Sequence, residues 1–182
     1  MKKTLILFSL FFIALHVQAQ SVSDENQFIL KEVDWTFNVP AGFILKDSGT
    51  TTQQMGNNIE LWRRRFFFKN DKNTFAFSII KFSYQTEGGW EQTYQTERNR
   101  SFQIITKQKP MLKIDSLTTL TFIGDLGFNK FTMKGKENNE IVFNQVQLSK
   151  HYKGYYFQLT YISTDPTIIE EIEKALKNSK FN

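Results

Sequence analysis

Aromatic side chains that alternate with polar ones constrain this sequence more than any other feature. The chain carries 19 phenylalanines in 182 residues, and such rings favour β-strands. Between Val33 and Val39, Trp35 and Phe37 alternate with threonine and asparagine, which is the period of a strand with one buried face. Two further aromatic runs, Leu61 to Phe68 and Thr74 to Phe82, flank a short polar turn and predict a β-hairpin.

The last third of the chain predicts an antiparallel meander. Its strand candidates are separated by only a few residues, and connections of that length join antiparallel neighbours. The strand candidates run from Leu117 to Ile123, Phe128 to Met133, Ile141 to Tyr152 and Tyr155 to Ser163. On the last of these, four alternate aromatic and aliphatic side chains fall on one face, namely Tyr155, Phe157, Leu159 and Tyr161.

The C-terminal segment predicts a helix. Asp165 is a suitable N-cap, and Pro166 occupies the first helical position. The apolar residues that follow form a single stripe made of Ile168, Ile169, Ile172, Ala175 and Leu176. Glutamates precede lysines by four residues in this helix, the order that stabilises ion pairs, in Glu170–Lys174 and Glu173–Lys177.

Two other segments lack the alternation of a strand. Between Trp90 and about Ile105, just after Gly88-Gly89, apolar residues recur at spacings compatible with a moderately amphipathic helix. From Asp47 to Asn58 nearly every residue is polar, and we expect a loop there. Strands and helices together predict an α+β domain.

The N-terminus has the pattern of a cleaved export signal. Lys2 and Lys3 precede an apolar run, and small residues follow at Val17 and Ala19, so cleavage is expected before Gln20. The run is shorter than the ~20 residues that a membrane-spanning helix needs. We therefore expect a signal peptide at 1–19, a polar leader at 20–32 and a single domain at 33–182, with no transmembrane anchor after cleavage.

The composition narrows the chemistry that the chain can perform. The absence of cysteine removes disulfides, thiolate catalysis and the acylated cysteine of a lipoprotein. The expected location is therefore the periplasm or the extracellular medium, by a Sec-type signal. The formal charge of +5 falls to about +3 without Lys2 and Lys3, which is too weak to indicate nucleic acid. His151 is the single histidine after the signal, so neither a histidine metal site nor a cofactor is expected.

One cluster of positive charge interrupts the aromatic runs. It consists of Arg63, Arg64, Arg65 and Lys69, the candidate contacts for an anion or a partner. In a strand, Arg63 and Arg65 face one way and Arg64 faces the other, so the run cannot present all its guanidinium groups together. The alternative is that these arginines extend past a core or pair with Glu60 and its neighbours.

The order of elements resembles the PsbP-like family. The residues that carry the resemblance are Trp35-Thr36-Phe37-Asn38-Val39-Pro40-Ala41-Gly42-Phe43, the Trp90 helix, Gly154 to Tyr161, and Asp165 with a helix ending in Ser179-Lys180-Phe181. The resemblance spans roughly Val33 to Phe181. It implies a central antiparallel β-sheet flanked by helices, a PsbP-like α/β/α sandwich, and a family whose members bind larger partners without a shared enzymatic activity.

These observations leave three functional classes open. The first is an exported, non-enzymatic binding or accessory module for a larger envelope partner. The second is a binder of a small amphiphile or lipid in a pocket between sheet and helix, which the surplus of aromatic residues favours. The third is an enzyme of the carboxylate type, which would need two acids to converge in a cleft.

Overall fold

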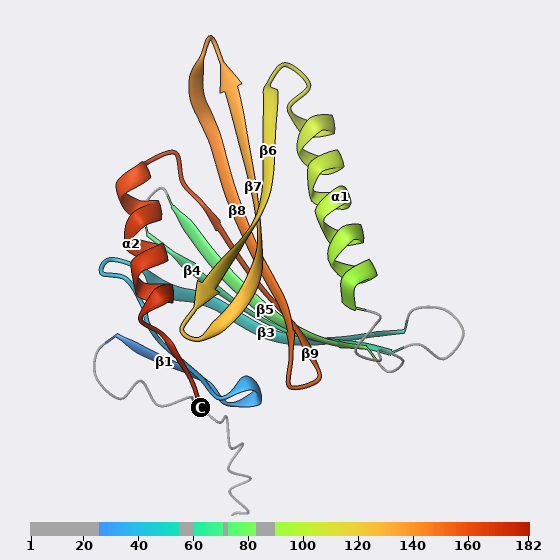
Figure 1. The fold of residues 1–182 in the computed structure, drawn as a ribbon, viewed down its shortest axis with the longest axis vertical. Helices are drawn as coiled ribbons and strands as arrows, with labels where there is room; N and C mark the ends of the chain where they lie inside the picture. The colour runs from blue at the N-terminus through green and yellow to red at the C-terminus, as the bar shows by residue number, and fades with distance from the viewer. Residues whose placement is uncertain (1–25, 55–59, 71–72, 83–89) are drawn as a thin grey trace, which may run out of the picture.

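The structure, a computed structural model, describes residues 26–54, 60–70, 73–82 and 90–182. Strands account for 58% of it and helices for 24%. Figure 1 shows how these elements are arranged. In chain order the elements are β1 (Gln27–Leu30), the short 3-10 helix η1 (Lys31–Val33), β2 (Trp35–Asn38), β3 (Ile44–Gln54), β4 (Glu60–Lys69), β5 (Thr74–Phe82), α1 (Trp90–Gln108), β6 (Lys113–Ile123), β7 (Leu126–Glu137), β8 (Glu140–Tyr152), β9 (Tyr155–Ile162), α2 (Pro166–Lys177) and β10 (Lys180–Phe181).

Part of what the sequence predicts lies outside the described residues. This applies to the signal peptide at 1–19, to its cleavage site and to Gly88-Gly89. Of the polar leader at 20–32, the described part contains β1 and most of η1. In the part of the chain that the structure describes, neither α1 nor α2 combines the length and apolarity needed to cross a bilayer.

The strands form two antiparallel sheets. The larger has seven strands in the order β3-β4-β5-β9-β8-β7-β6, and the smaller has three in the order β1-β2-β10. The β4–β5 hairpin and the meander from β6 to β9 agree with the sequence predictions. Pairing of β5 with β9 joins the hairpin and the meander into one sheet.

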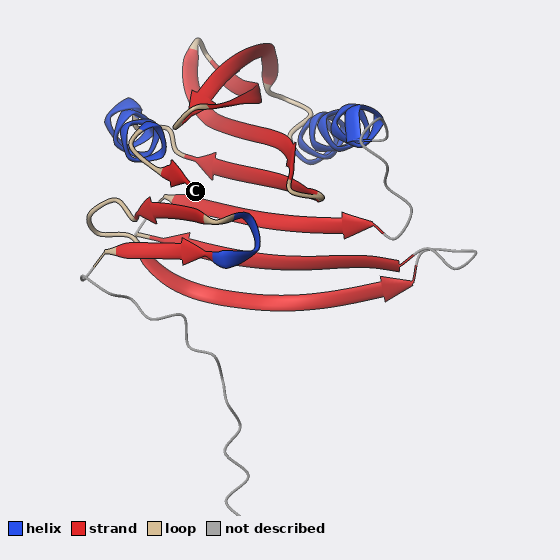
Figure 2. Ribbon diagram, turned by 60° about the horizontal axis from the view of Figure 1, so that its bottom comes forward, coloured by secondary structure: helices blue, strands red, loops and turns tan. Residues whose placement is uncertain are grey.

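The predicted architecture is wrong. Sequence patterns and the PsbP-like resemblance implied an α+β fold with a central sheet flanked by helices, whereas the structure is a mostly β fold with two sheets and two α-helices. Figure 2 shows the two helices at the sides of a molecule built mainly of strands. The reason is that β1, β2 and β10, from opposite ends of the chain, pair as a second sheet over the aromatic face of the first.

The main core lies between the two sheets and is predominantly aromatic. Phe28 of β1 meets Phe66 and Phe77 edge-on, at ring-centroid distances of 4.9 and 5.0 Å. Ile172 and Leu176 of α2 complete this core. Alternation along the strands therefore sends the rings to one face, as the sequence predicts, but a small sheet covers most of them.

The predicted loop from Asp47 to Asn58 is a strand over most of its length. β3 runs from Ile44 to Gln54 and pairs with β4 along the edge of the large sheet. Its described side chains are exposed, so the strand needs only backbone pairing and has no buried face. An edge strand of this kind carries no alternation of apolar and polar residues, and the sequence pattern therefore misses it.

The C-terminal helix is confirmed. The carboxylate of Asp165 accepts a hydrogen bond from the backbone N–H of Thr167 at 2.9 Å, and Pro166 begins α2. The helix expected from Trp90 is also confirmed and runs on to Gln108 as α1. Local capping signals and periodicity therefore suffice to place both helices.

Candidate functional site

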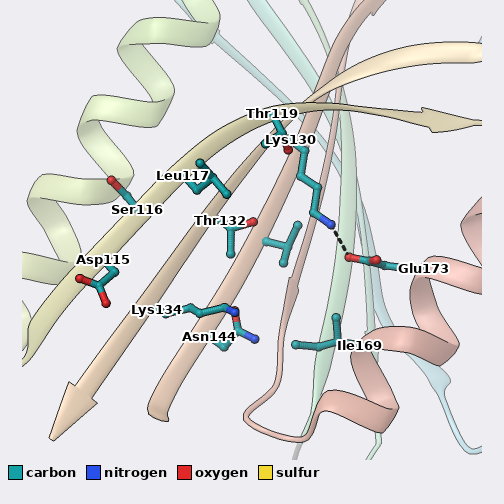
Figure 3. Close-up of a pocket in the computed structure, with 11 residues that line it drawn as sticks. Asp115, Ser116, Leu117, Thr119, Lys130, Thr132, Lys134, Asn144, Ile169 and Glu173 are labelled. Carbon is teal, nitrogen blue, oxygen red and sulfur yellow. Dashed lines mark hydrogen bonds and ion pairs between the residues drawn. The ribbon is translucent and has the colours of Figure 1, made fainter. Parts of the chain in front are cut away.

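The candidate site is a pocket between α2 and the large sheet, which we call the α2 pocket. Its volume is about 380 Å³, within the range of small-molecule sites. Figure 3 shows strand side chains forming its floor and α2 forming one wall. The lining residues are Asp115, Ser116, Leu117, Thr119, Lys130, Thr132, Lys134, Asn144, Val146, Ile169 and Glu173.

Strand register arranges most of the floor in two rows. Leu117 of β6 pairs with Thr132 of β7, which pairs with Val146 of β8, and this row is largely apolar. One step along the strands, Asp115 pairs with Lys134, and Lys134 pairs with Asn144. Because side chains alternate across a sheet, residues two apart on each strand share the pocket face. The floor thus changes from a largely apolar row to a polar row over two residues of each strand.

The polar end of the α2 pocket offers a cation and a hydrogen-bond acceptor. Within the described residues, Lys134 makes no ion pair. Its neighbour Asp115 instead pairs with Lys136 at 2.9 Å, a contact that lowers the pKa of the Asp115 carboxyl. The side-chain oxygen of Asn144 is buried and has no hydrogen-bond partner in the part of the chain that the structure describes.

An ion pair fixes α2 to the sheet at the other end of the pocket. The Lys130 ammonium lies 2.7 Å from a carboxylate oxygen of Glu173, the contact drawn as a dashed line in Figure 3. The hydroxyl of Tyr161 donates to the same oxygen at 2.7 Å. Beyond this pair lies a smaller hollow of about 240 Å³, which shares Lys130 and Glu173 with the α2 pocket. The ion pair therefore separates two cavities along one side of α2.

Because two tyrosines are buried, we expect the protein to lose stability at alkaline pH. Burial raises the pKa of Tyr156 and of Tyr161, and the nearby Glu173 carboxylate raises the pKa of Tyr161 further. In the unfolded chain both hydroxyls ionise near pH 10. The contribution of the two protonated hydroxyls to the free energy of unfolding is therefore fully present below about pH 10. It is lost as the pH rises above that value, by up to ~1.4 kcal/mol per pH unit for each tyrosine.

Urea unfolding at a series of pH values between about 9 and 11 measures this effect. In wild type the free energy of unfolding should fall as the pH rises above about 10. The fall should be less steep in Tyr161→Phe and in Tyr156→Phe, because each variant removes one of the two ionisable hydroxyls. A double variant that keeps the wild-type slope would show that these hydroxyls are not its source.

The structure separates the four predicted contact residues. Arg63 and Arg65 line a groove beside α1, which we call the α1 groove and whose volume is about 320 Å³. Arg64 lies on the opposite face, over the ring of Phe66, and forms an ion pair with Glu32. Lys69 is exposed at the end of β4 and is not among the side chains that line the groove.

The α2 pocket contains none of the residues that the sequence analysis selected. Apart from Glu173 on α2, its polar residues are lysines, threonines, an aspartate, a serine and an asparagine on strands, and strand register brings them together. Among the described residues, no group of three or more histidines or acids could hold a metal ion. A sequence signal for this site exists in two alternating sets, Asp115, Leu117 and Thr119 on β6 and Lys130, Thr132 and Lys134 on β7.

No model of a known protein family matches this sequence, and no curated protein matches it either.

Proposed function

We propose that this chain is an exported, non-enzymatic protein that binds a small amphiphile in the α2 pocket. The observation that carries the proposal is the division of the pocket floor. One row is largely apolar, and the next presents Lys134 beside Asn144. Export is supported by the N-terminal sequence alone.

The apolar part of the pocket suits a hydrocarbon body. Leu117 and Val146 on the floor and Ile169 on α2 line the pocket together. Leu117 is 63% exposed and leaves apolar surface for a ligand to cover. Removing such surface from water stabilises a complex by roughly 25 cal/mol per Å².

The polar part of the pocket suits an acidic head group that also carries a hydroxyl. The Lys134 ammonium would pair with a carboxylate or phosphate, and the unpartnered oxygen of Asn144 would accept a hydrogen bond from the hydroxyl. A buried acceptor without a partner is costly, so satisfying it favours a ligand that brings a donor.

Native mass spectrometry of the tagged protein, purified under mild conditions from its own host, tests this proposal. We expect a species whose mass exceeds that of the chain by one small amphiphile, and we expect the variant Thr132→Phe to lose it. The bare chain alone, in repeated preparations, would argue against amphiphile binding.

A second function, docking to a larger envelope partner, is favoured by the edge strand β6. This strand pairs only with β7 among the described strands, so one side of its backbone is unpaired. Leu120 and Phe122 on β6 are 64% and 60% exposed. Long apolar edges are surfaces on which other chains add strands. The same mass spectra separate the two functions, since a partner would add the mass of a protein.

A further inference from the structure

The α1 groove lies on the face of the large sheet opposite the α2 pocket, and this face mixes buried polar side chains with buried apolar ones such as Phe131 and Met133. On β8, Val146 and Leu148 join the aromatic core, whereas Gln145, Gln147 and Ser149 alternate with them and turn the other way. These three polar side chains are nevertheless buried. Strands usually send polar residues to solvent, so these buried polar side chains call for hydrogen-bonding partners.

Two donors near the groove have no such partner in the described part of the chain. Gln147 is 1% exposed, and its carbonyl oxygen accepts a hydrogen bond from Ser101 of α1 at 3.3 Å. Its amide nitrogen has no partner, and neither does the buried Nε of Arg63. Ser101 and Arg63 both line the groove. The unpartnered Nε of Arg63 favours a ligand that brings an acceptor oxygen into the groove, whereas Gln147 lies three strands away on β8 and is not among the lining residues.

The groove also carries an excess of positive charge. Arg63 and Arg65 project from β4, and Arg100 projects from α1. Glu97 is the only acid among the described lining residues, and it lies 3.9 Å from Arg100. Neither Arg63 nor Arg65 makes an ion pair with any described residue. Guanidinium groups bind carboxylates through paired, charge-assisted hydrogen bonds.

Three polar residues among the remaining lining residues point to the class of anion, while Ala76, Phe77 and Ile104 are apolar. Ser78, Gln158 and Thr160 are neutral groups that both donate and accept hydrogen bonds, as the hydroxyls of a sugar require. Glu97 adds an acceptor, and its negative charge repels a doubly charged phosphate more strongly than a singly charged carboxylate. We propose that the α1 groove binds a sugar acid, with its carboxylate at Arg63 and Arg65 and its hydroxyls along the strands.

Titration with D-glucuronate, followed through the ¹H–¹⁵N signals of the arginine Nε groups, tests the site. Saturable shifts are expected for Arg63 and Arg65. The variants Arg63→Gln and Arg65→Gln should each weaken binding by about tenfold or more, since each removes a charge-assisted hydrogen bond. Glucose should cause no shift at the same concentration.

The matched control is Arg64→Gln. It removes the same charge from the same strand, but its side chain lies on the opposite face with Glu32. This variant should bind D-glucuronate as the wild type does, and its fold is checked by circular dichroism. Equal weakening by Arg64→Gln would overturn the site, because the effect would then follow net charge. Binding of inorganic phosphate as tight as that of D-glucuronate, or no binding at all, would overturn the ligand class.

Discussion

Replacing Trp35 by alanine is expected to lower the free energy of unfolding by about 3 to 5 kcal/mol, the largest stability effect of any single substitution proposed for this protein. The side chain is fully buried in the aromatic core. Its ring stacks on Phe37 at 5.0 Å between centroids and meets Phe77 and Phe157 edge-on at 5.3 and 5.2 Å. Removing it leaves a cavity that rigid rings on three sides cannot fill.

Trp35 also connects the two ends of the chain. Its indole N–H donates to the hydroxyl of Ser179 at 2.8 Å, and that hydroxyl donates to the carbonyl of Leu176 at 2.6 Å. Strand β2 is thereby tied to the C-terminal end of α2. The variant Trp35→Phe keeps most of the buried surface but leaves this hydroxyl without its donor, and should cost about 1 to 3 kcal/mol.

Equilibrium urea unfolding measures both Trp35 variants. Phe122→Ala is the matched control, because this ring is also aromatic but is 60% exposed, and its loss should change stability by no more than about 0.5 kcal/mol. Because a domain of this size has a total stability of about 5 to 15 kcal/mol, Trp35→Phe keeps the test measurable if the alanine variant is largely unfolded. A Trp35→Ala variant as stable as Phe122→Ala would contradict the assignment of the core.

The substitution Thr132→Phe is expected to abolish or strongly weaken binding in the α2 pocket. Thr132 lies at the centre of the floor, between Leu117 and Val146 in the strand register. A phenyl ring at this position would rise into the space that the ligand's hydrocarbon body needs. We expect affinity for 3-hydroxydecanoate, a carboxylate amphiphile with one hydroxyl, to fall by about tenfold or more, equivalent to ~1.4 kcal/mol.

Isothermal titration calorimetry with 3-hydroxydecanoate measures this loss. The control is Thr118→Phe, which places the same ring on the neighbouring strand but on the opposite face, where Thr118 pairs with Phe131. Decanoate, which lacks the hydroxyl, should bind the wild type more weakly because the Asn144 oxygen stays without a donor. Equal binding by the Thr132→Phe and Thr118→Phe variants would place the amphiphile elsewhere.

The sequence by itself determined those features that depend on local periodicity. Alternation of side chains set the β4–β5 hairpin, the β6 to β9 meander and the opposite directions of Arg63 and Arg64, because a strand has a period of two wherever it lies. Asp165 set the start of α2, because an N-cap side chain accepts its hydrogen bond from a backbone N–H in the first turn of the same helix, here that of Thr167.

Only the tertiary structure decided which distant segments pair and which side chains meet. Pairing of β2 with β1 and β10 produced the second sheet, and this changed the architecture from the one predicted. Glu173 of α2 pairs with Lys130 of β7 rather than with Lys177 four residues on, because a partly buried partner offers a stronger attraction than a solvated one. The α2 pocket has the same origin, since strand register places Lys134 beside Asn144 and no local pattern records that contact.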